Sequence, residues 1–415
     1  MEPVSGPGTE NGGVRGSAAR NRYGRMEWAG AFGDIGTLIP FAVGYITLLG
    51  FDPLGLLFSF GAANIMIGLY YRRPVPVQPM KAIGAGAIAH SATITPDIVW
   101  GAGLFTGAFW LLMAVTGMVE RITRFVVKPV VRGVMLGLGM SFMLQGARMI
   151  AGDDRVLSLF GDNGDAALLG GWYGPAIGVA AVGITLLLLR NRKLPAMFVL
   201  LLLGIVAGAV NAHGDPDLWG RLTAIGPDFR LPGFALGSIG FSDLVEGTAL
   251  LALAQIPLTL GNAVVAVTAE HNTLFPEKPV TERKISLSQG LLNLAVPVIG
   301  GVPVCHGAGG MAGHVRFGAR TGGATVILGF FLLLLALFFS NSVSTLFSVF
   351  PIELLGVILM FAGIELALTI GDVGRRKQDV FLLIVTAGIC IWNIGWGFLA
   401  GVVLSQLIRW KRIEL

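Results

Sequence analysis

Long apolar runs fill most of this chain, and short segments with Gly, Pro or charged residues separate them. A helix rises about 1.5 Å per residue and the apolar core of a bilayer is about 30 Å thick, so about 20 apolar residues predict one crossing. The pattern predicts an all-α polytopic membrane protein of about fourteen spans. Their expected bounds are 28–49, 54–71, 78–92, 97–118, 128–148, 167–189, 194–212, 242–268, 285–300, 305–317, 321–340, 344–370, 379–391 and 394–410.

Two of these runs, 78–92 and 305–317, are too short for a full crossing, and each follows a Val-Pro-Val segment. We therefore expect half-helices in spans 3 and 10. Because these spans are seven apart, the pattern predicts two seven-span repeats of inverted topology. Spans 1 and 8 also carry polar, Gly/Pro-containing interruptions, at Gly33–Thr37 and Gln255–Asn262, where such a repeat requires them.

Composition agrees with a membrane protein: 54% of the residues are hydrophobic, only 13% are charged, and 61 are glycine, which argues against a soluble enzyme. The net charge of +5 comes from clusters between apolar runs, so the positive-inside rule explains it better than nucleic-acid binding does. With an even number of spans, both termini are expected in the cytoplasm. The two cysteines sit in apolar context, so we expect no disulfide framework.

The segment before the first span, residues 1–25, is rich in Gly, Ser, Asn and Arg and is expected to be a disordered cytoplasmic tail. Residues 26–410 form the expected transmembrane transporter domain. The loops expected on the cytoplasmic side contain the basic pairs and triplets of the chain, among them Arg72-Arg73 and Arg375-Arg376-Lys377.

The start of span 10 combines small and polar residues in an otherwise apolar region. Small side chains there leave backbone N–H groups open to a ligand, as at anion-binding helix starts. The candidate ligand residues of this segment are Cys305, His306, Gly307, Gly309 and Gly310. A metal site built from Cys305, His306 and His314 is disfavoured, because no acidic cluster completes it, and neither a metal nor another cofactor is expected.

Lys81 lies at the expected start of the other half-helix, where an unpaired ammonium at membrane depth is costly. Lys81 is the main candidate for binding an anion. Alternatively, its side chain could extend to the membrane surface or pair with Asp34. Gln78 can add an amide donor. Further candidate substrate ligands in span 8 are Gln255, Thr259 and Asn262, which could instead bridge helices.

Two titratable side chains, Asp34 and His306, lie at the broken helices and are the candidates for carrying protons. Asp34 could instead neutralise Lys81 or satisfy broken backbone, and His306 could be a hydrogen-bonded interior histidine.

Four segments resemble the molybdate transporter family, a branch of the sulfate permease (SulP) superfamily. They are PVQPMKAIGAG (Pro76–Gly86), PVCHGAGGMAGHVRFGARTGG (Pro303–Gly323), GDIGTLIPF (Gly33–Phe41) and GNAVVAVTAEH (Gly261–His271). One departure is His314, where the family usually has Gln. The resemblance implies the fold of uracil permease, with a core domain (28–118 and 242–340), a gate domain (128–212 and 344–410) and no STAS domain.

The function expected from these observations is secondary active transport of molybdate by alternating access, with protons as the favoured coupling ion. The expected partners are molybdate and membrane lipid, in the plasma (inner) membrane, and a homodimer is one assembly that the sequence leaves open. A sulfate transporter and an anion channel on the same scaffold remain alternatives. A uracil permease would need an acid at Gln255, and no nucleophile with a positioned base indicates an enzyme.

Overall fold

The computed structural model describes residues 20–122, 127–152, 173–188, 196–213, 216–348, 350–392 and 394–410. Most of these residues are in helices. The described residues also contain two short β-strands, β1 (Gln78–Pro79) and β2 (Val304–Cys305). Most of the expected tail, residues 1–19, lies outside the described residues, and helix α1 begins at Arg25.

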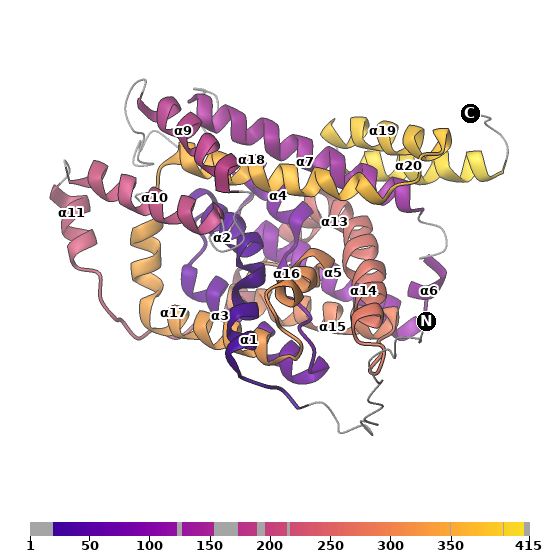
Figure 1. The fold of residues 1–415 in the computed structure, drawn as a ribbon, viewed down its shortest axis with the longest axis horizontal. Coiled ribbons are helices and arrows are strands. Elements are labelled where there is room, and N and C mark those ends of the chain that lie inside the picture. Colours follow the sequence, from indigo (N-terminus) through magenta and orange to yellow (C-terminus); the bar gives the residue numbers. More distant parts are fainter. Residues whose placement is uncertain are drawn as a thin grey trace, which may run out of the picture.

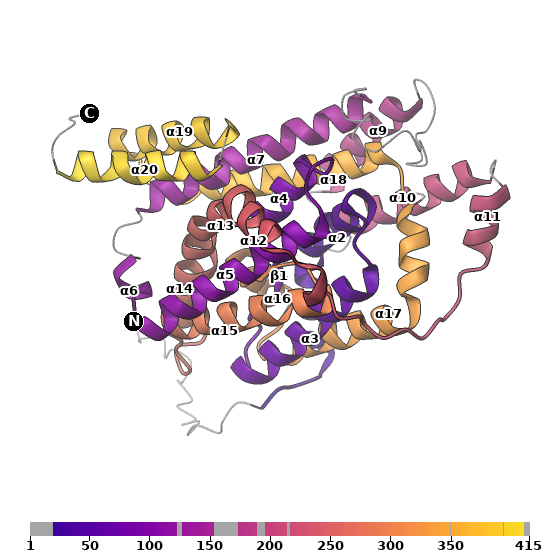
Figure 2. The same ribbon diagram turned by 180° about the vertical axis from the view of Figure 1, so that it is seen from behind.

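The helices form a layer and a bundle that lie against each other (Figures 1 and 2). The layer runs along one edge in both views and consists of α7 (Lys128–Ala151), α18 (Ile352–Leu368), η7 (Thr369–Asp372), α19 (Lys377–Trp392) and α20 (Ile394–Arg409). At one end of the molecule lie α9 (Tyr173–Leu188), α10 (Ala196–Ala212) and α11 (Pro216–Thr223).

Both halves of the chain contribute to the bundle, which surrounds the two strands. Its first part is α1 (Arg25–Ala31), η1 (Phe32–Asp34), α2 (Ile35–Leu49), α3 (Pro53–Tyr71), α4 (Lys81–Ala89), α5 (Pro96–Thr116) and α6 (Val119–Ile122). Its second part is η3 (Leu236–Ser238), α12 (Phe241–Gly247), η4 (Thr248–Ala252), α13 (Leu253–Leu258), η5 (Thr259–Ala266), α14 (Val267–Leu274), α15 (Glu282–Ala295), η6 (Pro297–Ile299), α16 (Ala308–Arg316) and α17 (Gly323–Ser348).

Five helical stretches in the described residues are long and apolar enough to cross a membrane. They are Pro53–Tyr71, Pro96–Thr116, Lys128–Ala151, Phe241–Leu274 and Gly323–Phe347. The helices over Arg25–Asp34 and Thr37–Leu49 meet at a 48° bend and would make a sixth if they count as one broken span. Four further apolar helices are shorter, so the described residues show fewer full-length crossings than the sequence predicts.

The helical stretch Phe241–Leu274 contains two π-helical segments, η4 and η5, and Pro257 lies between them. Proline removes a backbone donor, and a π-helical turn frees a further backbone group. The interruption expected at Gln255–Asn262 is therefore a distortion within one helical stretch. The side chains of this region are carried by irregular helical backbone.

The expected boundary between spans 321–340 and 344–370 lies beside a kink. Within α17 (Gly323–Ser348) two helical stretches meet at Phe339, whose backbone angles (φ −136°, ψ 15°) are not helical. The carbonyls of Leu337 and Phe338 accept N–H groups from a crossing segment, at Arg230 and Asp228, at 2.9 and 2.8 Å. These partners satisfy backbone carbonyls that the kink leaves without helical donors.

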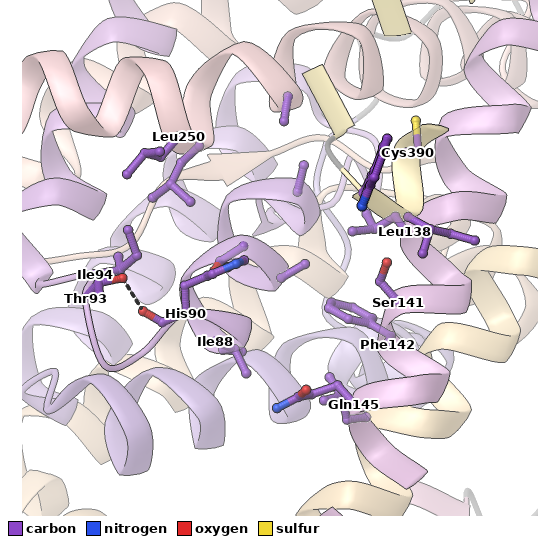
Figure 3. Close-up of a pocket in the computed structure, with 18 of the residues that line it drawn as sticks. Ile88, His90, Thr93, Ile94, Leu138, Ser141, Phe142, Gln145, Leu250 and Cys390 are labelled. Atoms are coloured by element: carbon purple, nitrogen blue, oxygen red, sulfur yellow. Dashed lines mark hydrogen bonds between the residues drawn. The ribbon is translucent and has the colours of Figure 1, made fainter. Parts of the chain in front are cut away.

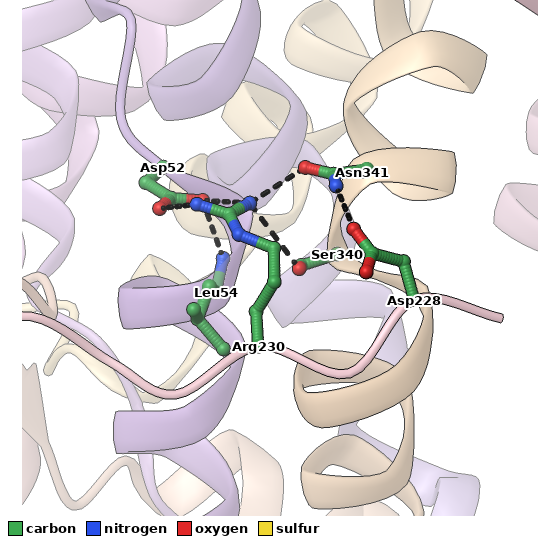
Figure 4. Close-up of polar contacts among 6 residues, drawn as sticks. All are labelled: Asp52, Leu54, Asp228, Arg230, Ser340 and Asn341. Atoms are coloured by element: carbon green, nitrogen blue, oxygen red, sulfur yellow. Dashed lines mark hydrogen bonds and ion pairs between the residues drawn. The ribbon is translucent and has the colours of Figure 1, made fainter.

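The crossing segment, residues 226–238, joins the two halves of the chain over one end of the bundle. Arg230 contacts Asp52, at the start of α3, with an Nη2–Oδ2 distance of 2.8 Å (Figure 4). It also donates to Asn341 Oδ1 at 2.6 Å, and Asn341 in turn donates to Asp228. The polar residues of α17 therefore bind this segment.

Candidate functional site

The short strands at the two Val-Pro-Val segments pair with each other at the centre of the bundle. β1 and β2 pair antiparallel, with Gln78 opposite Cys305 and Pro79 opposite Val304, and Met80 N donates to Pro303 O at 2.8 Å. Helices α4 and α16 follow directly, each nine residues long. At 1.5 Å per residue such a helix covers about half of a bilayer's apolar core. The pairing brings two sequence-distant helix starts together.

Side chains from α15 complete the outer edge of β2. Asn293 accepts from Val304 N at 2.8 Å and donates to Val304 O at 2.7 Å. Gln289 accepts from His306 N at 3.1 Å and also donates to Val304 O. Two amides thus replace a neighbouring strand. The sequence analysis missed both residues, although two amides four residues apart in a predicted span were a usable signal.

The start of α4 is closed by the side chain of Gln255. Its Oε1 accepts from Ala82 N at 2.8 Å and from Ile83 N at 3.4 Å, and its Nε2 donates to Thr259 Oγ1 at 2.9 Å. Helix starts leave backbone donors without intrahelical partners, and here a buried amide oxygen satisfies two of them. Gln255 and Thr259 are therefore used in holding α4.

The start of α16 is open by comparison. Gly307 precedes the helix in extended conformation and provides no side-chain cap. In the part of the chain that the structure describes, no hydrogen bond is made by Ala308 N or Gly309 N. A Cβ added at Gly309 would meet nothing within 4 Å. Free backbone donors, open space and the positive end of the helix dipole are what an anion requires.

Asp34 and Gln78 lie against the same helix start. Gln78 Nε2 donates to Asp34 Oδ1 at 2.5 Å and lies 3.4 Å from Thr37 Oγ1. A Cβ on Gly310 would come within 2.5 Å of Gln78 Nε2 and 2.6 Å of Asp34 Oδ2. A Cβ on Gly307 would collide with the Gln78 side chain. These two glycines therefore permit close packing, whereas Gly309 faces free space.

Lys81 is the first residue of α4 and is half-buried. Among the described residues it has no carboxylate within ion-pair distance, but its charge acts on both Asp34 and Cys305. Lys81 follows the strand pair directly, because Met80 is hydrogen-bonded to Pro303, and it brings a positive charge to this part of the bundle. A partly buried cation without a paired acid favours binding of an external anion.

Cys305 and His306 are buried within the strand pair. Cys305 Sγ lies 3.7 Å from Pro79 O. His306 has hydrogen-bond partners at both ring nitrogens, since Nδ1 is 2.8 Å from Pro76 O and Nε2 is 2.9 Å from Ser288 Oγ. In this structure the imidazole connects β2, the first Val-Pro-Val segment and α15.

Asn262, in η5, is buried, and no hydrogen bond of its side chain occurs among the described residues. Gln78, Lys81, Gln255, Cys305, Gly307, Gly309 and Gly310 are brought together around the two helix starts by the contacts above. Among the described residues, no three His, Cys, Asp or Glu side chains cluster as a metal site would require.

A cavity of about 270 Å³ lies between α4 and the layer (Figure 3). Its wall along α4 extends from Ala82 to His90, and Ser141 and Gln145 of α7 face it from the other side. Ala82 belongs both to this wall and to the capped start of α4. The cavity therefore extends from the capped start of α4 along the boundary between bundle and layer.

Comparisons with known proteins identify the family of this chain. A family model described as "Molybdate transporter of MFS superfamily" matches residues 26–142 and 247–366. Molybdate transporter 2 of Arabidopsis thaliana is 33% identical, with 94% of this chain and 88% of the relative aligned. Molybdate transporter 1 of the same plant is 30% identical over 92% of this chain and 88% of the relative.

Among solved structures, the transmembrane domain of the cyanobacterial bicarbonate transporter BicA matches with a TM-score of 0.66, at 15% identity, over 90% of this chain and 97% of that one. The murine Slc26a9 anion transporter in its inward-facing state matches with a TM-score of 0.67, at 12% identity, over 95% of this chain and 69% of that one. These likenesses show the fold, and the sequence matches show the family. The chain is a helical integral membrane protein with a SulP-like fold and belongs to the molybdate transporter family.

Proposed function

We propose that this protein is a secondary active transporter that moves molybdate across the membrane by alternating access. The curated relatives named as molybdate transporters support this substrate. In the proposed architecture fourteen spans form two inverted seven-span repeats, with α4 and α16 as the half-helices. The bundle is the core domain, the layer with α9 and α10 is the gate domain, and the cavity lies at their boundary.

The observation that carries the proposal is the open start of α16 beside Lys81. Molybdate is a tetrahedral dianion whose oxygens accept hydrogen bonds. We place it against Ala308 N and Gly309 N, with the Lys81 ammonium as its main counter-charge and with Asn262 as a further donor. Gln78 lies beside this site but donates to Asp34, so it positions the carboxylate and completes the site wall.

The other candidate residues have supporting roles in this proposal. Gln255 and Thr259 hold α4 so that Lys81 faces the site. His306 and Cys305 fix the strand pair, and Gly307 and Gly310 let Gln78 and Asp34 approach α16. A fixed scaffold of this kind keeps the free donors of α16 in position before the anion arrives.

We further propose that the membrane is the plasma (inner) membrane and that both termini lie in the cytoplasm. One end of the bundle carries Arg72, Arg73, Lys278 and Lys284. Burial, and then the charges of the other three, lower the pKa of Lys278, which shows how closely the cations are grouped. The positive-inside rule assigns such an end to the cytoplasm.

Transport of a dianion into a negatively charged interior requires a coupled ion. The electrical work is about 2.3 kcal/mol per charge per 100 mV, so about 4.6 kcal/mol for molybdate at that potential. Two co-transported protons would make the cycle neutral. Asp34 is the proposed proton carrier because it is buried at the site. Uptake should then rise as outside pH falls and decrease with a protonophore.

The central test is molybdate binding to purified Lys81→Ala. We expect loss of measurable binding by calorimetry with an unchanged melting temperature, because the substitution removes the ammonium but no recorded ion pair. Lys377→Ala is the matched control, since Lys377 is an exposed lysine at the start of α19. Unchanged affinity in Lys81→Ala would remove this residue from the site.

Sulfate is the second candidate substrate, since a sodium-independent sulfate anion transporter of Bos taurus is 27% identical over 44% of this chain. Both anions are tetrahedral dianions, so charge alone separates them poorly. Competition of molybdate uptake by tungstate, sulfate and uracil in proteoliposomes decides between them. Uptake that follows only the substrate gradient would instead indicate a channel.

A further inference from the structure

His314 is a buried histidine of α16 with one ring nitrogen in use. Its Nδ1 lies 2.7 Å from Gly30 O, and because a carbonyl only accepts, Nδ1 carries the hydrogen in this contact. Nε2 is buried and has no hydrogen-bond partner among the described residues. The imidazole can therefore gain a proton at Nε2 without breaking any recorded hydrogen bond.

Asp34 lies across a close contact from this histidine. The backbones of η1 and α16 touch at two glycines: a Cβ on Gly33 would lie 2.6 Å from Gly313 O and 2.9 Å from His314 N. A Cβ on Gly313 would in turn lie 2.6 Å from Gly33 O and 3.8 Å from Asp34 N. The backbone that carries Asp34 is thus in direct contact with the backbone that carries His314.

His306, the other histidine near the strand pair, differs in this respect. Its Nδ1 is bonded to Pro76 O, its Nε2 lies 2.9 Å from Ser288 Oγ, and the Ser288 hydroxyl donates to Ile285 O. Both ring nitrogens of His306 are therefore used in holding the strand pair, whereas Nε2 of His314 has no partner in the described chain.

Other charged and titratable groups surround this pair. Glu27, on α1, accepts from Arg320 N and Thr321 N and so is bound to the loop after α16. Elements that pack against the pair also carry Arg25, Tyr45, Lys81, Glu270, His271, Cys305, Arg316 and Arg320. Of these, Lys81 is the cation that acts on Asp34.

We propose that Asp34 and His314 together form a two-proton site beside the anion site, an inference that rests on the proposed transport function. Asp34 alone carries one proton, whereas neutral transport of a dianion requires two. With both protons bound, the carboxyl group is neutral and the imidazolium is positive. Together with Lys81 the protein then presents two positive charges to molybdate, and on proton release its local charge falls to zero.

The test uses infrared titration of the full-length protein in lipid vesicles without substrate. We expect a protonated-carboxyl band that is absent in Asp34→Asn. In His314→Gln the midpoint pH of this band should move up by about one unit or more, because the amide cannot carry the cation that favours the carboxylate. Gln can still donate to Gly30 O, so the fold should persist. In His306→Gln the midpoint should stay within a few tenths of a unit.

Histidine NMR of the same samples gives a second readout that needs no Asp34 variant. His314→Gln should remove one histidine signal whose chemical shift changes with pH. An unchanged carboxyl midpoint in His314→Gln, or loss of a signal that does not titrate, would overturn the two-proton site.

Calorimetry in buffers of different ionisation enthalpy measures how many protons the protein takes up when it binds molybdate. This number should be about one lower in His314→Gln than in the original protein. Equal proton numbers would overturn the pair while leaving molybdate transport in place. Absence of molybdate binding to the original protein would overturn the proposed function, and the infrared and NMR titrations would still decide whether Asp34 and His314 titrate together.

Discussion

The two half-helices begin in the same kind of sequence but end up with different surroundings. α4 and α16 both follow Val-Pro-Val, both have nine residues, and their strands pair with each other. Yet Gln255 closes the start of α4, while Ala308 N and Gly309 N at the start of α16 have no partner in the described chain. Lys81 is the first residue of α4, the helix whose start is closed.

Because the two helix starts differ, each contributes a different group to the proposed anion site. The closed helix start supplies a fixed position for a charged side chain, and the open helix start supplies backbone donors. An ammonium group provides charge with little directional preference, whereas backbone N–H groups fix oxygen positions. We infer that selectivity among tetrahedral anions depends mainly on α16, and that overall affinity depends on both.

Among the substitutions that test the difference between the two helix starts, Gly309→Ala has the largest expected effect. A Cβ there has free space, and Ala favours a helix over Gly, so Gly309→Ala should keep or slightly raise the melting temperature. The methyl group points toward the N-terminal end of the helix and would occupy part of the anion space. We expect molybdate affinity to fall about a hundredfold, or about 2.7 kcal/mol, measured by calorimetry on purified protein.

Gly310→Ala is the matched control for this prediction. Its Cβ would collide with Gln78 and Asp34, so the substitution should destabilise the fold by about 1–3 kcal/mol. Normal binding in Gly309→Ala would show that the anion does not approach the start of α16.

Asn293 tests whether the open start depends on its outer support. Asn293→Leu keeps the approximate volume but leaves Val304 N without its acceptor, which should lower the free energy of unfolding by about 2 kcal/mol. Binding should weaken as well, because β2 positions α16. Ser286→Ala, on a buried residue of the same helix whose hydroxyl has no partner in the described chain, is the control and should change both quantities little. A destabilised Asn293→Leu that binds normally would mean that α16 is positioned without β2.

The sequence predicted the family, the helical fold, the two short helices and the segments that meet, since apolar run length and Val-Pro-Val mark them directly. It could not distinguish the two helix starts, because the cap of α4 comes from Gln255, more than 170 residues further along the chain. Nor could it separate His306 from His314 as interior histidines. Which ring nitrogen remains free depends on carbonyls and hydroxyls from distant segments.

Gln255→Ala has the smallest expected effect on molybdate affinity, and it tests most directly whether the two helix starts differ in function. Gln255→Ala frees Ala82 N and Ile83 N, so the free energy of unfolding should fall by about 1 kcal/mol, as for loss of a helix cap. If the open start of α16 holds the anion, molybdate affinity should change less than threefold, because Lys81 remains on α4. Calorimetry and thermal melting of the same sample measure both quantities, and Thr259→Val, which removes the other partner of the Gln255 amide, should give a similar pattern. An affinity loss as large as that in Gly309→Ala would show that α4 binds the substrate equally, and the proposed division between a charged start and a donor start would be wrong.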